Sequence, residues 1–280
     1  LLSQDNILCM AEELDGTHEI THTSAHDEKG DTLLSLASHE LRTPLSIIKW
    51  YSEMLLDGDC GELNEDQSKY LKTIQASNQR AIDLIRSLLN VSRLDLGTFS
   101  IKPESVDLRV LVKSVIEDYK TVASEKNVHI EELYESTVQG SVPNIQVDKH
   151  ICVVLLRSLL SNAVSFSNSD GKVVISVKDV KQGEEHGSRK ILDDSLLISV
   201  SYNGIGIPTQ EQDKIFTKLF KASNAQTDDR KGAGLGLYVV SLILSKTGGE
   251  IWFVSEQNIG TTFYIALPMH GMPEKAGTTN

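Results

Sequence analysis

Residues 38–45, Ser-His-Glu-Leu-Arg-Thr-Pro-Leu, hold the side chains with the clearest capacity for chemistry. A carboxylate such as that of Glu40 can hydrogen-bond the neighbouring His39 imidazole, which fixes its tautomer and makes the other ring nitrogen more nucleophilic. Pro44 has no N–H and its ring clashes with the carbonyl of Glu40, so we expect a bend in a helix beside the histidine. The pattern predicts a nucleophilic imidazole on a turn that can move.

Two glycine-rich segments could hold phosphate, because loops that lead into helices offer an anion free N–H groups and the positive end of the helix dipole. Residues 203–208 follow a predicted strand, and residues 232–237 precede a predicted helix. One such cluster is weak evidence, since turns need glycine for steric reasons alone. Two clusters that flank the polar stretch 223–231 favour a phosphate site. Their glycines are Gly204, Gly206, Gly232, Gly234 and Gly236.

The chain of 280 residues is acidic, with a formal net charge of −12. Binding to nucleic acid needs a basic face and none is evident, so we expect no nucleic-acid partner. An anionic ligand must therefore be held by local positive charge. Four cations close to the second glycine segment could supply it: Lys218, Lys221, Arg230 and Lys231.

The elements that must position His39 are two long helices joined by a short turn. Their apolar residues recur at heptad steps, at Leu34, Leu41, Leu45, Ile48 and Leu55 and then at Leu71, Ile74, Ala81, Ile85 and Leu88. Residues 57–61 between them are typical of a turn, and Asn64 with Gln67 resembles a capping box that starts the second helix. His39 falls beside the seam, so we expect it to project into solvent. One hairpin has too narrow a core to stand alone, which predicts that two chains pair through residues 31–96 into a four-helix bundle.

Strand-like and helix-like periods alternate after residue 97. We expect an extended segment at 99–106, helices at 108–124, 149–166 and 235–246, and strands at 172–180, 195–201, 251–255 and 261–267. Residues 181–194, rich in charge and glycine, are expected to form a hairpin insertion. This mixture indicates an α+β or α/β sandwich that is distinct from the helical hairpin.

The chain therefore divides into a linker or signalling segment at residues 1–30, a helical domain at 31–96, an α/β domain at 97–268 and a polar, disordered tail at 269–280. The linker carries three histidines at helical spacing. They could bind a metal, but a solvated linker is the simpler interpretation. They are His18, His22 and His26.

The three cysteines, Cys9, Cys60 and Cys152, have no paired spacing, which favours a reducing compartment. Cys152 lies in an apolar run and is expected to be a buried, inert thiol. No stretch approaches the ~18 consecutive apolar residues of a membrane span. The chain opens with Leu1, so we interpret it as a cytoplasmic fragment whose membrane anchor or sensor domain would lie upstream.

Residues 39–44, His-Glu-Leu-Arg-Thr-Pro, resemble the H box of the sensor histidine kinases of two-component systems. The resemblance covers roughly residues 31–268, with the boxes in the family's order. It implies a dimerisation and phosphotransfer hairpin followed by a Bergerat-type ATP-binding domain. By the same resemblance, His39 is autophosphorylated from ATP and passes the phosphoryl group to an aspartate of a response-regulator receiver domain. Glu40 would act as the general base, and Thr43 would orient water when the partner is dephosphorylated.

The glycine segments look like the two glycine boxes of that ATP-binding domain, with residues 223–231 as its lid and residues 215–220 as its F box. The resemblance implies nucleotide contacts from the five glycines, from Leu237, and from Lys218, Arg230 and Lys231. It also implies that Asn162 of the N box coordinates Mg²⁺, for which an amide oxygen is a suitable hard donor.

Three positions depart from the family's pattern. Tyr202 stands where the family has an aspartate that accepts a hydrogen bond from the adenine amino group, and Ser158 and Ser165 replace an asparagine and a lysine of the N box. Loss of the charge-assisted acceptor would cost roughly 1.5–3 kcal/mol, or about 10- to 150-fold in affinity. The tyrosine could fill the adenine slot, stack on the base or offer it a hydroxyl.

Three functions are compatible with these residues. The first is an ATP-dependent histidine kinase with weakened nucleotide affinity. The second is a nucleotide-impaired or phosphatase-biased dimeric scaffold that retains the H box. The third is an ATPase or serine kinase of the same fold, which an H box on a heptad helix disfavours.

Overall fold

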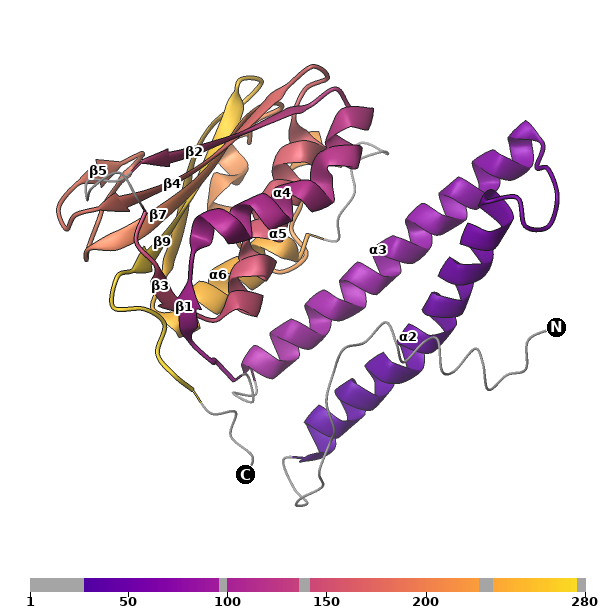
Figure 1. Cartoon of the computed structure of the whole chain (residues 1–280), viewed down its shortest axis with the longest axis horizontal. Helices are drawn as coiled ribbons and strands as arrows, with labels where there is room; N and C mark the ends of the chain where they lie inside the picture. The colour runs from indigo at the N-terminus through magenta and orange to yellow at the C-terminus, as the bar shows by residue number, and fades with distance from the viewer. Residues whose placement is uncertain (1–27, 96–99, 136–141, 227–233, 276–280) are drawn as a thin grey trace. The chain divides into compact units, whose positions relative to one another are not determined.

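The computed structural model describes residues 28–95, 100–135, 142–226 and 234–275, without the side chains of residues 28–39, 80, 83 and 86–95. The chain divides into two compact units, Leu1–Thr98 and Phe99–Thr278. The first unit is helical and the second is built of helices and a mixed sheet (Figure 1), which confirms the predicted fold class.

The helical unit is a hairpin of α2 (Glu28–Leu56) and α3 (Glu65–Asp95). Gly58 and Gly61 in the connecting turn have φ angles of 87° and 105°, which glycine adopts without strain. The predicted capping box is confirmed at the start of α3. The Gln67 N–H donates to Asn64 Oδ1 at 2.8 Å, and the Asn64 N–H donates to Gln67 Oε1 at 2.9 Å.

The heptad seam is only partly covered within one hairpin. Ile48 and Ile74 are 43% and 46% exposed, although both belong to the predicted seam. The most deeply buried of the described side chains between the two helices are Ser52, Asn78 and Ile82. A single chain thus leaves a stripe of apolar side chains in contact with solvent.

The α/β unit is organised around a five-stranded sheet with the order β2-β4-β7-β9-β8. These strands are β2 (His129–Glu135), β4 (Lys172–Val180), β7 (Ser195–Asn203), β9 (Gly260–Pro268) and β8 (Glu250–Glu256). β2 pairs with β4 in parallel, and the other neighbours are antiparallel. A separate antiparallel pair joins β1 (Glu104–Val106) to β3 (Ile145–Val147).

One face of this sheet is covered by α4 (Leu108–Glu125), α5 (Lys149–Phe166) and α6 (Gly236–Thr247) (Figure 1). Asp107 and Asp148 cap α4 and α5 by accepting hydrogen bonds from first-turn N–H groups. Fully buried side chains from both layers form the main core, among them Leu108, Leu155, Leu159, Leu160, Val200, Ile243, Phe263 and Ile265. Two short 3-10 helices, Thr209–Lys214 and Ser223–Ala225, lie between β7 and α6.

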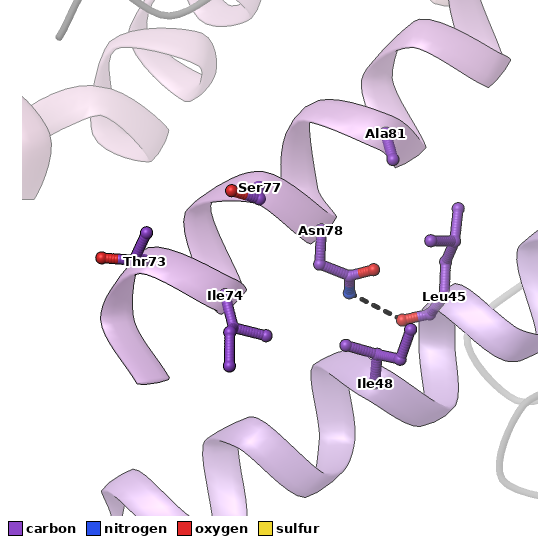
Figure 2. A pocket seen from close by; sticks show the side chains of 7 residues that line it. All are labelled: Leu45, Ile48, Thr73, Ile74, Ser77, Asn78 and Ala81. Atoms are coloured by element: carbon purple, nitrogen blue, oxygen red, sulfur yellow. Dashed lines mark hydrogen bonds between the residues drawn. The ribbon is translucent and has the colours of Figure 1, made fainter. Parts of the chain in front are cut away.

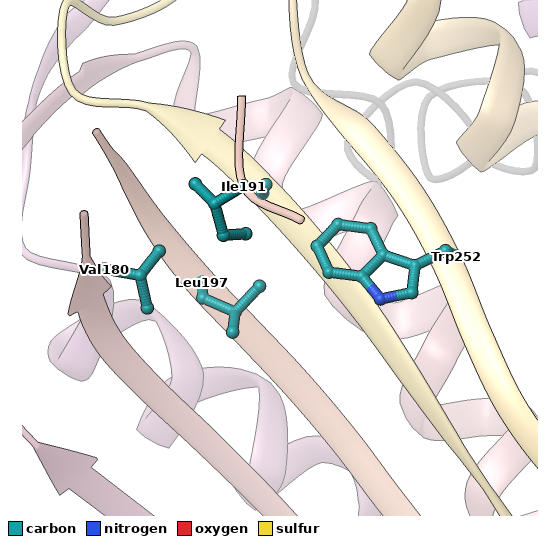
Figure 3. Packing of buried hydrophobic residues seen from close by; sticks show 5 residues of the cluster. Val180, Ile191, Leu197 and Trp252 are labelled. Atoms are coloured by element: carbon teal, nitrogen blue, oxygen red, sulfur yellow. The ribbon is translucent and has the colours of Figure 1, made fainter. Parts of the chain in front are cut away.

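The opposite face of the sheet is partly covered by the hairpin insertion, which contains β5 (Glu185–His186) and β6 (Arg189–Lys190). Beneath it a second apolar cluster gathers Val180, Ile191, Leu197, Trp252 and Ala266 (Figure 3). The Trp252 ring stacks on Tyr264 at 5.4 Å between centroids, and its Nε1–H donates to the His186 carbonyl at 2.9 Å. The predicted insertion is therefore packed onto the sheet.

Helix 149–166 and strand 172–180 were predicted with the bounds that the structure gives them, whereas β2 and β3 were not predicted. The expected disordered tail is wrong for residues 269–275. Met272 is buried there, and its N–H donates to the Gln146 carbonyl at 2.8 Å. Lys275 forms an antiparallel bridge with Ile101. Polar composition suggested disorder, but these backbone bonds hold the segment against β3 and Ile101.

Among the described residues, α5 is the one helix long and apolar enough to cross a membrane by length and composition. Eight of its side chains are buried against the neighbouring helices and β7, as in the core helix of a folded domain. Cys152 lies on this helix with 1% exposure, and burial raises the pKa of its thiol to about 12. The predicted buried thiol is confirmed.

Candidate active site

His39 belongs to α2, and its side chain lies outside the described part of the chain. Glu40, the next residue, is exposed, and Thr43, one helical turn after His39, is half-buried. The helix continues through Pro44. Immediately beyond, the Leu45 carbonyl accepts a hydrogen bond from Asn78 of α3 at 2.7 Å. The backbone after the histidine turn is therefore tied to the second helix of the hairpin.

The first glycine segment leaves the end of β7 and packs tightly against the protein's own backbone. A Cβ on Gly204 would lie 2.1 Å from the Phe166 carbonyl oxygen, and one on Gly206 would lie 2.0 Å from that of Glu256. Gly206 also has a φ of 58°, a left-handed conformation that favours glycine. Gly204 is thus required against the end of α5, and Gly206 against the turn between β8 and β9.

The second glycine segment leads into α6. Gly234 has a φ of 72°, and a Cβ there would lie 2.6 Å from the Phe220 carbonyl oxygen. Gly236 is the first residue of α6, where a Cβ would lie 3.1 Å from Ser158 Oγ, and Leu237 follows it. Among the described residues, no side-chain hydrogen bond caps this helix, in contrast to the aspartate caps of α4 and α5. The first-turn N–H groups of α6 therefore remain available to an anion. Gly232 lies outside the described residues.

Helix α5 connects the two glycine segments. Ser158 lies against the start of α6, and Phe166 lies against Gly204. Asn162 is half-buried on the same helix, one turn after Ser158 and one turn before Phe166. The structure thus brings both glycine segments to a short stretch of one helix, with Asn162 at its middle.

Asn224 joins the two halves of this region in a way that the sequence did not reveal. Its Nδ2 donates to the carbonyls of Ile205 and Gly206 at 3.2 and 3.0 Å. Its Oδ1 is buried and has no hydrogen-bond partner among the described residues. The segment that precedes the second glycine loop is therefore bonded to the first. An isolated asparagine in a polar stretch carries no signal of such a contact.

One of the predicted positive charges lies beside the start of α6. Lys218 is exposed, and its Nζ lies 5.4 Å from the ring centroid of Tyr238 in the first turn of that helix. Phe216 of the same segment packs edge-on against Phe253 of β8 at 5.9 Å. Arg230 and Lys231 lie outside the described residues, as do the three histidines of the N-terminal segment. No cluster of three or more metal-binding side chains occurs in the described part of the chain.

Tyr202 lies at the end of β7 and is 5% exposed. Strand alternation places it on the same face as Val200, which belongs to the core beneath the helices. Its hydroxyl is hydrogen-bonded to Thr261, its cross-strand neighbour on β9. Burial raises the pKa of Tyr202 to about 12, and the bond to Thr261 opposes this shift. The phenol is therefore neutral at physiological pH.

The hydroxyl of Tyr202 begins a hydrogen-bond chain across three strands. Ser255 Oγ donates to the Gly260 carbonyl (3.1 Å) and accepts from the Ile207 N–H (2.9 Å). Its Oγ also lies 2.8 Å from Thr261 Oγ1, and either hydroxyl can be the donor in this hydrogen bond. Thr261 is in turn hydrogen-bonded to Tyr202. This series of hydrogen bonds connects the Tyr202 side chain to the backbone of the first glycine segment. It depends on strand register, which local sequence patterns cannot reveal.

Two families of known domains match the chain. Residues 31–97 match the family described as "His Kinase A (phospho-acceptor) domain". Residues 148–271 match the family described as "Histidine kinase-, DNA gyrase B-, and HSP90-like ATPase". Together the two matches cover more than half of the chain, one in each compact unit.

Curated relatives are sensor kinases. The sensor histidine kinase WalK of Bacillus subtilis (strain 168) is 28% identical over 251 residues, which cover 90% of this chain and 38% of that protein. The sensor protein kinase WalK of Staphylococcus saprophyticus subsp. saprophyticus has the same identity and coverage. The chain thus spans less than half the length of these relatives.

Solved structures of histidine kinases share the fold. Full-length ShkA in complex with AMPPNP superposes with a TM-score of 0.64 at 24% identity, covering 88% of this chain and 47% of ShkA. AdeS of Acinetobacter baumannii gives a TM-score of 0.55 at 21% identity, with coverage of 83% and 98%. ThkA in complex with the response regulator TrrA gives 0.55 at 20% identity, with coverage of 87% and 62%.

The helix that contains His39 lies in the part of the chain that matches the phospho-acceptor family. The two glycine segments, joined through α5, lie in the part that matches the ATPase family. The chain belongs to the sensor histidine kinases of two-component systems.

Proposed function

We propose that this chain is the kinase region of a two-component sensor, which autophosphorylates His39 from Mg-ATP and transfers the phosphoryl group to an aspartate of a response regulator. The observation that carries the proposal is the convergence of both glycine segments on residues 158–166 of α5. Such a convergence places an uncapped helix N-terminus, Asn162 and the first glycine loop around one region. A polyphosphate requires groups of this kind.

The residue roles in this proposal follow the H box on α2. His39 accepts the phosphoryl group, Glu40 takes the proton from its imidazole, and Thr43 orients a water molecule when the response regulator is dephosphorylated. Glu40 is exposed and adjacent to His39, so its carboxylate is accessible to a substrate-bearing domain. ATP supplies the transferred phosphoryl group.

The donor set at the nucleotide site fits phosphate and Mg²⁺ better than it fits the base. The first turn of α6 offers uncapped N–H groups, and Lys218 lies beside it. We propose that the α6 turn with Gly234, Gly236 and Leu237 binds phosphate, together with Gly204 and Gly206 of the first segment. Lys218 would add positive charge, as would Arg230 and Lys231, and Gly232 would add a backbone N–H to the second glycine segment. Asn162 would hold Mg²⁺ through its amide oxygen.

We further propose that two copies of the chain pair through residues 31–96. The exposed apolar side chains at Ile48 and Ile74 support this, because a four-helix bundle would cover them. A recess of about 350 Å³, lined by Leu45, Ile48, Thr73, Ile74, Ser77, Asn78 and Ala81, lies along the same stripe (Figure 2). A receiver domain is the proposed second partner, and the kinase region is proposed to lie in the cytoplasm, with any membrane or sensor segment upstream.

A second candidate function is favoured by Tyr202. Its ring is buried, and its hydroxyl is committed to Thr261 at the position where the family has a base-binding aspartate. A ring held in this way leaves less room for adenine and offers no carboxylate to its amino group. The chain would then be a nucleotide-impaired or phosphatase-biased dimeric scaffold that keeps Glu40 and Thr43.

Mg-ATP titration and phosphorylation of the full chain from γ-labelled ATP separate these candidates. We expect the wild type to acquire an acid-labile phosphoramidate, and we expect His39→Ala to acquire none. His150→Ala is the matched control, because His150 is an exposed histidine of the other unit. Tyr202→Asp should bind Mg-ATP about 10- to 150-fold more tightly.

The possible outcomes decide between the two candidate functions or refute a part of both. Phosphate on the His39→Ala protein would refute the assignment of the phosphorylated residue. Nucleotide binding by Tyr202→Asp but not by the wild type would favour the scaffold. If neither protein binds nucleotide, the proposed nucleotide site is wrong.

A further inference from the structure

Asn78 is a polar residue at a heptad position of α3. The positions 71, 74, 78, 81 and 85 follow one another at steps of three and four, and all except Asn78 are apolar. The side chain is 5% exposed, which makes it more buried than Leu71, Ile74, Ala81 or Ile85. A carboxamide therefore occupies a place in the hairpin core where packing alone would favour leucine.

The hydrogen bonds of this carboxamide are unequal. Its Nδ2 donates to the Leu45 carbonyl across the hairpin at 2.7 Å (Figure 2). Its Oδ1 is buried and has no partner among the described residues. The orientation of the amide is determined by the Leu45 carbonyl, which can only accept. A buried acceptor without a partner lowers stability, whereas an apolar side chain of similar size would avoid that loss.

We propose that Asn78 is a register-fixing residue that holds α3 in one alignment on α2 at a cost in stability. Leucine and isoleucine contacts along a heptad seam tolerate a slip of one turn, because each alignment buries similar apolar surface. The bond from Asn78 to the Leu45 carbonyl belongs to the observed alignment, and a slip of α3 by one turn would break it. A single asparagine at a core heptad position is the best-attested device of this kind in helical assemblies.

The location of the bond gives the register a functional consequence, which rests on the proposed phosphorylation of His39. Leu45 directly follows Pro44 and lies six residues after His39 on α2. A slip of α3 by one turn would move its side chains about 5 Å along the axis relative to the histidine turn. Asn78 therefore acts as a positioning residue for that turn, and nucleotide binding in the other unit is independent of it.

The proposal predicts opposite signs for stability and turnover in Asn78→Leu. We expect thermal unfolding of the hairpin, followed by Trp50 fluorescence in a Trp252→Phe background, to shift upward by on the order of 5 °C. We expect kcat for His39 phosphorylation to fall roughly 10- to 100-fold, with the KM for Mg-ATP unchanged. Asn78→Asp keeps the shape but loses the donor, so its melting temperature and its kcat should both fall.

Ser52→Ala is the matched control, because Ser52 is equally buried but its hydroxyl bonds to Lys49 of its own helix. It should not alter kcat. A merely structural role for Asn78 would make kcat follow the melting temperature in every variant.

Disulfide trapping reports the alignment of α3 on α2 and does not require catalysis. With Cys9 and Cys60 replaced by serine, Ile48→Cys is paired either with Ile74→Cys, since both residues line the recess, or with Leu71→Cys, one turn away. We expect the chain with Asn78 to form only the 48–74 intramolecular disulfide, and Asn78→Leu to form both. If Asn78→Leu forms only the 48–74 pair, or loses no kcat, the proposal is overturned. If the wild type phosphorylates no histidine, the proposed function fails, and the disulfide pattern alone decides the register.

Discussion

Tyr202 combines a buried environment with a hydrogen bond to Thr261. Its hydroxyl is hydrogen-bonded to Thr261, the Thr261 hydroxyl is hydrogen-bonded to Ser255, and Ser255 Oγ donates to the Gly260 carbonyl. The hydroxyls of Ser255 on β8 and Thr261 on β9 therefore have a neutral phenol beside them.

The raised pKa of Tyr202 predicts a specific loss of stability in alkali. An unfolded tyrosine ionises near pH 10, whereas burial raises the folded pKa to about 12. The stabilising contribution is fully present below pH 10 and is lost as the pH rises through 12, because only the unfolded chain releases the proton in between. At pH 11 the loss amounts to about 1.4 kcal/mol.

Denaturant unfolding of the wild type and of Tyr202→Phe at pH 9 and pH 11 measures this loss. The phenylalanine variant should lose about 1.4 kcal/mol less than the wild type over that interval. Its lost bond to Thr261 lowers stability equally at both pH values and cancels in the comparison. Equal losses in the two proteins would show that Tyr202 is not the buried phenol responsible.

The start of α3 depends on a reciprocal pair of backbone caps. Asn64 and Gln67 each accept a hydrogen bond from the other's main-chain N–H at 2.8–2.9 Å. Replacement of an N-cap asparagine by alanine costs about 1 kcal/mol. We therefore expect Asn64→Ala to lower the free energy of unfolding of the hairpin by about 1 kcal/mol, measured by denaturant titration of Trp50 fluorescence.

Thr73→Ala is a suitable control for this variant, since the Thr73 hydroxyl donates to the Lys69 carbonyl within the interior of the same helix. It should change stability by less than the cap variant. An Asn64→Ala protein as stable as the wild type would mean that solvent replaces the cap without loss.

The elements that could be predicted from sequence are those that depend on local patterns. Helix 149–166 is apolar along its length and begins at the cap residue Asp148, and strand 172–180 alternates cleanly, so both were predicted at their observed bounds. β2 carries a run of charged residues and pairs in parallel with β4 across more than 35 residues of chain. No local periodicity of apolar residues predicts such an edge strand.

The candidate site likewise contains residues that the sequence reveals and residues that only the fold reveals. Glycine segments and the H box are visible because their residue types are unusual at close spacing. The partners of Tyr202 become apparent only when the register brings Thr261 and Ser255 beside it. Asn78 and Asn224 escaped notice because an asparagine's significance depends on its burial, and burial is a property of the folded chain.

Assembly of the whole molecule is expected to depend on the apolar stripe of the hairpin. Ile74→Lys places a charge among side chains that a four-helix bundle would bury, so we expect it to convert a dimer into a monomer in sedimentation equilibrium. Val110→Lys is the matched control. Val110 is 66% exposed on α4, outside the hairpin, and its replacement should leave the dimer intact. A wild type that is monomeric, or an Ile74→Lys protein that remains dimeric, would contradict the proposed interface.

The bridge between Ile101 and Lys275 places the entry and the exit of the α/β unit side by side. The Ile101 N–H donates to the Lys275 carbonyl at 2.8 Å, and the Lys275 N–H donates back at 3.1 Å. A domain whose two ends meet is a cassette: it can be excised, transplanted or circularly permuted with both junctions at one place. Joining these ends by a short linker and opening the chain at the exposed tip of the β5–β6 hairpin would leave every strand pairing of the five-stranded sheet in place.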